Sequence, residues 1–444
     1  MKNAYIERLA EADEFEIVKT VGEYYVDAVA CSSTAFTLNV FDMNQYDTND
    51  MQRILDGLSS TLLALKRKPA IRFQKSSQIA ARVANEIAGV MGDAHRQAFD
   101  FRRMDVQPVL LIVDRLSDLT SVLLTQWTFQ AMLHDMLPHG GIVNNRIRFD
   151  PDDAKQEMSL SIDQDAFYRE NLYANYGQIG DRIQHMVRQY EQRAREHSRT
   201  DPASIVDMKR FIHDYPEWRR QGEQVAKYVS LACSLQRLID DHRLLERSEM
   251  EQAMLTNGDP ILALNVLESM MTEHGGEERL RMALLYVSYY GKRQGFNQLT
   301  LMDRMKPFIS QEQVKMLDKV IQNMATYEQT QDTSSPIQQI GDNVLDDTVY
   351  TRHISPLTVT IDRLLRGRLP LHDFPIIQTS ANQNSSQSDK PTDVIVFSVN
   401  GGSYQEECQL QRLVHRLHPH VRLVYGCTGF LNSGHVVEAL AHME

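Results

Sequence analysis

Short runs with the pattern of strands lie near both ends of the chain, and apolar residues recur at helical spacing between them. Four such runs lie in the first section, at 25–30, 35–40, 71–73 and 109–113, and the last of them is apolar throughout. Between these runs, residues 51–67 and 79–91 repeat apolar side chains every three or four positions, and Ser76 or Ser77 is expected to cap the second helix. Short apolar runs that alternate with helices predict a parallel sheet.

The middle of the chain, from about 155 to 325, loses the strand pattern and shows helical periodicity. Its longest predicted helix covers 218–246, where Val225, Val229, Ala232, Leu235, Ile239 and His242 share one face. Tyr215-Pro216 separates this helix from another predicted at 204–213, because proline disfavours helical backbone in the residue before it. These two helices are predicted to form a long hairpin that turns near Pro216.

Strands and helices alternate again near the C-terminus. Polar segments at 329–336 and 379–391 have the composition of loops. After them come predicted strands at 394–399 and 421–425 and predicted helices at 403–417 and 434–442. The predicted fold class is therefore α/β plus all-α, a parallel-sheet domain built from two chain segments with a large helical insertion. The expected division is 1–140 and 351–444 for the sheet domain and 141–350 for the helical domain.

Charge and cysteine content narrow the class of protein. The net charge is −12, from 47 basic and 59 acidic residues, which argues against a nucleic-acid partner and against broad adhesion to anionic lipid. The four cysteines are scattered without a CxxC pair, as in a reducing compartment. The N-terminus lacks the apolar core of a signal peptide, and no apolar run approaches the ~20 residues of a membrane span. We expect a cytoplasmic protein that reaches membranes only through partners.

The apolar run at 109–113 ends in Asp114-Arg115, and Asp118 follows three residues later. Open α/β folds usually carry their active sites at the carboxyl ends of parallel strands. These three residues could therefore be catalytic, as in a hydrolase or transferase. Alternatively, Arg115 bridges the two carboxylates and caps the following turn. Ser117, Thr120 and Ser121 lie nearby but have no identifiable base, which favours the structural interpretation.

Two further motifs suggest ligands. Asn400-Gly401-Gly402-Ser403 lies between a strand and a helix, where phosphate-binding turns occur, but it lacks the remaining residues of a dinucleotide loop or P-loop. A tight turn is the favoured interpretation. His415, His418 and His420 could bind a metal, yet Pro419 interrupts their helix and no Cys or carboxylate completes a tetrahedral set. No metal or other cofactor is predicted.

Collinear blocks of residues run through nearly the whole chain. They are 9–13, 72–77, 108–136, 144–147, 167–168, 171–173, 179–180, 207–209, 215–216, 244–246, 248–249, 251–252, 393–397 and 401–407. Through these blocks the chain resembles the SM (Sec/Munc) family of SNARE-binding proteins, most closely its vacuolar protein sorting branch. The match is specific because it spans so many separate blocks in order.

This resemblance implies an arch of three domains and a non-enzymatic function. Domain 2 would be the sheet domain, and domain 3 the helical insertion whose hairpin contacts SNARE helices, with Pro216 near the hinge. The expected SNARE-binding residues are Tyr215, Pro216, Trp218, Arg219 and Arg220. Asp114, Arg115, Asp118, Gly401 and Gly402 would be structural. The implied partners are syntaxin-type and other SNARE proteins in vesicle docking and fusion on endosomal, Golgi or vacuolar routes, without an obligate homo-oligomer.

Two departures from the family keep alternatives open. Family members have a further domain of roughly 100 residues before Leu9, which holds the syntaxin N-terminal peptide, whereas Met1 here falls almost at the start of domain 2. A short regulatory form with weakened syntaxin binding is therefore an alternative, beside an enzyme that uses Asp114 with the Gly401-Gly402 turn. The family also usually has a proline where this chain has Val122, so the turn after Asp118 is expected to be looser.

Overall fold

The computed structural model describes thirteen parts of the chain. They are residues 3–15, 17–21, 27–40, 46–94, 97–102, 106–137, 140–148, 157–199, 205–256, 258–326, 340, 348–377 and 390–441. The predicted loop at 329–336, most of that at 379–391 and the start of the predicted strand at 25–30 lie outside these residues.

Six strands from both ends of the chain form one sheet, in the order β1-β2-β8-β7-β4-β3. Their bounds are β1 (Val29–Ala30), β2 (Ala35–Thr37), β3 (Ala70–Phe73), β4 (Val109–Asp114), β7 (Asp393–Val399) and β8 (Arg422–Cys427). All neighbouring pairs are parallel except β1 with β2. Because β7 lies between β4 and β8, the prediction of a sheet built from two chain segments is confirmed.

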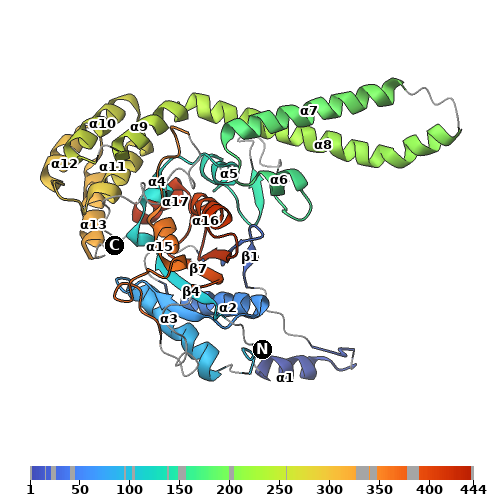
Figure 1. Ribbon diagram of the computed structural model, residues 1–444, viewed down its shortest axis with the longest axis horizontal. Coiled ribbons are helices and arrows are strands. Elements are labelled where there is room, and N and C mark those ends of the chain that lie inside the picture. The colour runs from blue at the N-terminus through green and yellow to red at the C-terminus, as the bar shows by residue number, and fades with distance from the viewer. Residues whose placement is uncertain are drawn as a thin grey trace.

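The strand β4 shows why its apolar run contains no polar interruption. Leu110 and Ile112 share a core with α2 (Thr48–Leu65) and α3 (Gln78–Gly89), which cover one face of the sheet. Leu111 and Val113 point to the opposite face and share a core with α5 (Phe129–Met136), α15 (Pro356–Leu365) and α16 (Tyr404–Leu417). Side chains alternate along a strand, so covering both faces requires apolar residues at successive positions. Figure 1 shows helices on both sides of β4 and β7.

Between β4 and β7 the chain is mainly helical. The helices are α6 (Ala166–Asn171), α7 (Tyr176–Arg199), α8 (Ile205–Asp241), α9 (Leu244–Thr256), α10 (Pro260–Glu273), α11 (Glu277–Tyr290), α12 (Gln298–Met305) and α13 (Gln311–Thr326). A separate apolar core joins α9 to α13 and includes α4 (Thr120–Leu123) and α17 (Ser433–Ala441). The helices α4 and α17 therefore share the apolar core of the helical insertion and join it to the sheet domain.

Further elements lie outside the sheet and the helical insertion's core. They are α1 (Asn3–Ala12), the π-helical turn Val90–Ala94, the 3-10 turn Arg115–Ser117 and the two-stranded hairpin of β5 (Arg146–Arg148) with β6 (Glu157–Ser159). The π-helical turn takes up Met91, which periodicity had assigned to the preceding helix.

A long helical hairpin is present, but its predicted turn is wrong. The helices α7 and α8 lie side by side and project from the body of the molecule (Figure 1). Pro216 lies inside α8, which continues from Ile205 to Asp241, and α9 begins only at Leu244. A proline inside a helix costs about 3 kcal/mol or more. Packing along α7 offsets this cost, so the helix continues through Tyr215-Pro216 instead of ending there.

Candidate functional site

The exposed surface of the α7–α8 hairpin is the first candidate site. Trp218 lies in the seam between the two helices and stacks on Tyr190 of α7, with ring centroids 5.8 Å apart and an interplanar angle of 15°. Gly222, one turn further along α8, makes this approach possible, because a Cβ there would lie 2.7 Å from the Tyr190 hydroxyl. Trp218 is therefore partly buried and holds the hairpin together.

The two arginines after Trp218 face solvent. Arg219 pairs with Glu223 at 3.0 Å, and both side chains are largely exposed, so this ion pair contributes little to stability. Arg220 is exposed and forms no ion pair with any described residue. Tyr215 belongs to α8 by its backbone, and its side chain falls outside the described part of the structure. Arg219 and Arg220 thus present positive charge that a partner could contact.

An open groove lies at the base of the hairpin. It runs between α8, through Arg220, Glu223 and Lys227, and the segment from Glu157 to Asp165. Asp165 lines this groove and connects its two sides. The Asp165 carboxylate accepts hydrogen bonds from the Tyr228 hydroxyl at 2.7 Å and from Lys227 Nζ at 3.1 Å. Burial, followed by the charge of Asp165, raises the pKa of Tyr228. The hairpin base is therefore rigidly joined to the segment that precedes α6.

The carboxyl end of β4 is the second candidate site. The Asp114 carboxylate accepts hydrogen bonds from the Ser77 hydroxyl at 2.6 Å, Asn400 Nδ2 at 2.8 Å and the Leu116 N–H at 3.0 Å. Ser77 is at the same time the N-cap of α3, where its hydroxyl accepts from the Ala80 N–H. These contacts commit both carboxylate oxygens to neighbouring elements and leave Asp114 poorly placed for acid/base work.

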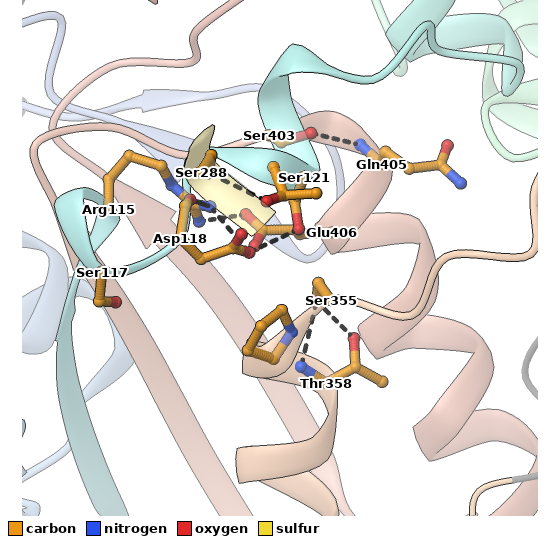
Figure 2. Close-up of polar contacts among 12 residues, drawn as sticks. Arg115, Ser117, Asp118, Ser121, Ser288, Ser355, Thr358, Ser403, Gln405 and Glu406 are labelled. Atoms are coloured by element: carbon orange, nitrogen blue, oxygen red, sulfur yellow. Dashed lines mark hydrogen bonds and ion pairs between the residues drawn. The ribbon is translucent and has the colours of Figure 1, made fainter. Parts of the chain in front are cut away.

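Arg115 connects three parts of the fold (Figure 2). It donates to the Asp118 carbonyl oxygen at 2.7 Å, lies 3.7 Å from the Asp118 carboxylate and pairs with the buried carboxylate of Glu406. Burial on its own would lower the pKa of Arg115, but the neighbouring Glu406, Tyr425 and Asp118 together outweigh burial and raise it. The expected contact with Asp118 is present, whereas the second carboxylate is Glu406 of α16, which the local sequence pattern missed.

The turn after Asp118 is closed by hydrogen bonds. The Val122 N–H donates to the Leu119 carbonyl at 3.1 Å, and the Val122 side chain is buried within α4. This hydrogen bond does not compare the turn with that of proline-bearing relatives, so the expectation of a looser turn stays a prediction. Valine can donate this hydrogen bond, whereas a proline could not.

Ser121 has a histidine beside it that sequence analysis did not identify. The Ser121 hydroxyl donates to the Asp118 carboxylate at 2.6 Å. His353 Nε2 lies 3.4 Å from the Ser121 hydroxyl oxygen. Because the serine proton is already donated to Asp118, the imidazole cannot act as the base that removes it. Burial lowers the pKa of His353, which keeps the ring neutral. This geometry differs from that of an activated nucleophile.

The Gly401-Gly402 turn is fixed against the segment that follows β8. The Gly402 N–H donates to the Gly429 carbonyl, and its carbonyl accepts from Leu431, both at 2.9 Å. Gly401 has φ +108°, and a Cβ on Gly402 would lie 2.5 Å from the Tyr425 hydroxyl. The N–H of Gly402 is thus already used within the protein, which disfavours phosphate binding at this turn.

The histidines at and after the end of α16 do not form a cluster, because His418 contacts a carboxylate instead. His418 Nε2 lies 3.2 Å from the Asp362 carboxylate, and the rings of His418 and His420 are 6.4 Å apart. Among the described residues no group of three or more His, Cys, Asp or Glu side chains could hold a metal ion. Within the same ranges no helix has the length and apolar character needed to cross a bilayer.

Comparison with known proteins agrees with the collinear blocks. A Sec1 family model matches residues 1–439. The chain is 33% identical over 452 residues to vacuolar protein sorting-associated protein 45 of Homo sapiens, which covers 98% of this chain and 77% of that protein. It is 31% identical over 468 residues to the homolog of Arabidopsis thaliana, covering 100% and 80%.

Solved structures show the same relationship. The SM protein Vps45 in complex with the Qa SNARE Tlg2 matches with a TM-score of 0.85 and 33% identity, over 99% of this chain and 79% of that chain. The Unc18–syntaxin 1 complex from Monosiga brevicollis, at 16% identity and a TM-score of 0.72 over 99% and 81%, shares the fold. The resemblance to SM proteins is confirmed, and the chain belongs to the Sec1 family.

Proposed function

We propose that this chain binds syntaxin-type SNARE proteins and supports vesicle docking and membrane fusion on endosomal or Golgi transport routes. The similarity to a Vps45 protein that was solved in complex with a Qa SNARE supports this proposal. The projecting α7–α8 hairpin is the structural feature that carries it, because it offers a long helical surface away from the sheet domain (Figure 1). The protein would act at the cytoplasmic face of these membranes through its partners.

The proposed mechanism is alignment of helical SNARE segments along the hairpin. Holding such segments in register removes conformational freedom before the four-helix bundle forms, and so lowers the entropic cost of assembly. Arg219 and Arg220 would contact the partner directly. Trp218 would act mainly by stacking on Tyr190, which keeps the two hairpin helices in place.

In this proposal the sheet domain, at 1–140 and 351–444, supports the helical domain at 141–350. Asp114, Arg115, Asp118, Gly401 and Gly402 would hold the junction between them. The proposed function requires no catalytic step. The relatives are SM proteins, and the hydrogen bonds of Asp114 and Ser121 do not favour the enzyme alternative.

Charge reversal on the hairpin tests the proposal. The double variant Arg219→Glu/Arg220→Glu should weaken binding of a syntaxin-type SNARE cytosolic region by about tenfold or more in isothermal titration, which corresponds to about 1.4 kcal/mol. Its thermal stability should stay nearly unchanged, because the Arg219–Glu223 pair is exposed. Arg237→Glu is the matched control, since Arg237 is also an exposed arginine of α8 but lies far along the helix from Arg220.

Equal SNARE affinity in the double variant and the unmodified chain would contradict the role of these arginines. Absence of SNARE binding by the unmodified chain would contradict the proposed function itself.

A further inference from the structure

The open groove at the base of the α7–α8 hairpin has a strand edge along one side. One wall is the segment that contains β6, and the other is the middle of α8, through Arg220, Ala226 and Ser230. The groove has a volume of about 850 Å³, within the range of roughly 300–1,000 Å³ that is usual for ligand sites. The groove therefore has room for a ligand, and the backbone of β6 indicates which kind.

The register of the β5–β6 hairpin determines which way the backbone groups of β6 point. Ser159 lies opposite Arg146, and the next residue, Leu160, donates its N–H to the Asn145 carbonyl at 2.8 Å. Hydrogen-bonded and non-hydrogen-bonded pairs alternate along an antiparallel ladder, so the backbone groups of Leu160 point toward β5. Those of Ser159, and of Glu157 two residues earlier, point to the opposite edge, and both residues line the groove.

A contact from α8 supports this direction. Lys227 Nζ donates to the Ser159 carbonyl at 3.2 Å across the groove. The N–H of Ser159 lies on the same side of the strand as this carbonyl. Neither that N–H nor the backbone groups of Glu157 have a hydrogen-bond partner among the described residues. Lys227 therefore occupies one position that a neighbouring strand would use, and the other positions are open to an added strand.

The charges along the groove are paired, with one exception. Each lining carboxylate has a cationic side chain within 3.1 Å. The pairs are Glu157 with Arg146, Asp165 with Lys227, and Glu223 with Arg219. Arg220 lines the groove but forms no ion pair with any described residue. A ligand with a carboxylate would complement Arg220, whereas a basic ligand would place two positive charges together.

We propose that the groove binds an extended acidic segment of a partner protein, which adds as a strand to the outer edge of β6. The added strand donates an N–H to the Ser159 carbonyl in place of Lys227 and accepts a hydrogen bond from the Ser159 N–H. A carboxylate of the segment pairs with Arg220. In strand addition, main-chain hydrogen bonds supply affinity and side-chain contacts supply specificity.

The position of the edge favours a separate segment over a second copy of this chain. The edge of β6 faces α8 across the groove, so the edge of another copy, enclosed in the same way, cannot approach it. The contact also differs from the alignment of helical SNARE segments proposed above, and it does not depend on that function.

Selection of short random peptides displayed on phage, with the unmodified chain as the target, tests this site. The enriched peptides should be acidic. Ser159→Pro removes the N–H that faces the groove but none of the hydrogen bonds to β5, and it should weaken binding of these peptides by about tenfold. Arg148→Pro is the matched control, because it places a proline on the opposite edge of the same hairpin, and it should leave their affinity nearly unchanged.

Hydrogen exchange in the unmodified chain gives a second measurement that needs no variant. A bound peptide should slow exchange at the backbone amides of 157–160, since it covers the Ser159 N–H. Unchanged exchange at these amides overturns the proposal, as does the absence of any enriched peptide. Enriched peptides that bind Ser159→Pro as tightly, or that bind as helices by circular dichroism, also overturn it. A dimer of the chain that Ser159→Pro dissociates would assign the edge to a second copy and overturn it as well.

Discussion

At the residue scale, Glu406 shows what local sequence patterns can and cannot predict. The run that ends at Asp114 correctly indicated a buried strand with charged residues at its end, and Asp118 was correctly expected beside Arg115. Glu406 is separated from Arg115 by 291 positions, so no spacing rule relates the two residues. Only the pairing of β4 with β7 brings α16 over the strand end.

The substitution Arg115→Leu should destabilise the fold by about 3–5 kcal/mol, because it leaves the buried carboxylate of Glu406 without its counter-charge. Urea unfolding measures this change. Arg219→Leu is the matched control in an exposed ion pair and should change the free energy of unfolding by less than about 1 kcal/mol. Similar changes in the free energy of unfolding for the two variants would show that the buried ion pair contributes no more to stability than the exposed one.

His134 predicts a dependence of stability on pH. Its Nδ1 accepts from the Ile142 N–H at 3.1 Å, and its Nε2 lies 3.1 Å from the Phe430 carbonyl, so the neutral ring satisfies both neighbours. Burial lowers its pKa from 6.5 to about 3. Because the folded pKa lies below the unfolded one, the contribution to stability is complete above pH 6.5 and is lost as the pH falls toward 3.

The measurement is urea unfolding between pH 8 and pH 4 for the unmodified chain and for His134→Gln. The unmodified chain should lose up to a few kcal/mol more stability over this range than the variant does. Parallel curves for the two proteins would contradict the assignment to His134.

At the element scale, periodicity and capping residues predicted most strands and helices, while one long-range contact overrode a local signal. Ser77 caps α3 as expected. The break expected at Pro216 is absent, because α8 packs along α7 through Trp218 and Gly222. The intrinsic effect of proline on a helix is real, but tertiary packing decides whether the helix ends.

Removal of this proline should strengthen the outer part of the hairpin. Pro216→Ala restores a backbone N–H and relieves the clash with the preceding turn, which is worth about 3 kcal/mol locally. Hydrogen exchange should therefore slow in the first half of α8, with little change in the sheet. Faster exchange in this part of α8 would mean that the helix requires the proline.

At the scale of the whole molecule, the order of strands makes the two chain ends interdependent. The strand β7 lies at the centre of the sheet, with β4 from the first segment on one side and β8 on the other. Apolar side chains of β7 enter both cores, since Ile395 packs on the α2 and α3 side and Val396 on the opposite side. Composition could predict that both ends share a sheet, but not this order, which depends on which strands pair in space.

This strand order predicts that the two fragments stay associated when the backbone is cleaved just before β7. A protease site inserted into the segment 379–391, whose composition is that of a loop, would leave β7 paired on both edges after cleavage. The two fragments should therefore elute together from a size-exclusion column and separate only in denaturant. A control site placed between β7 and α16, at the tightly packed Gly401-Gly402 turn, should instead prevent folding. Spontaneous release of the C-terminal fragment after cleavage in 379–391 would show that the first segment forms a stable sheet without β7.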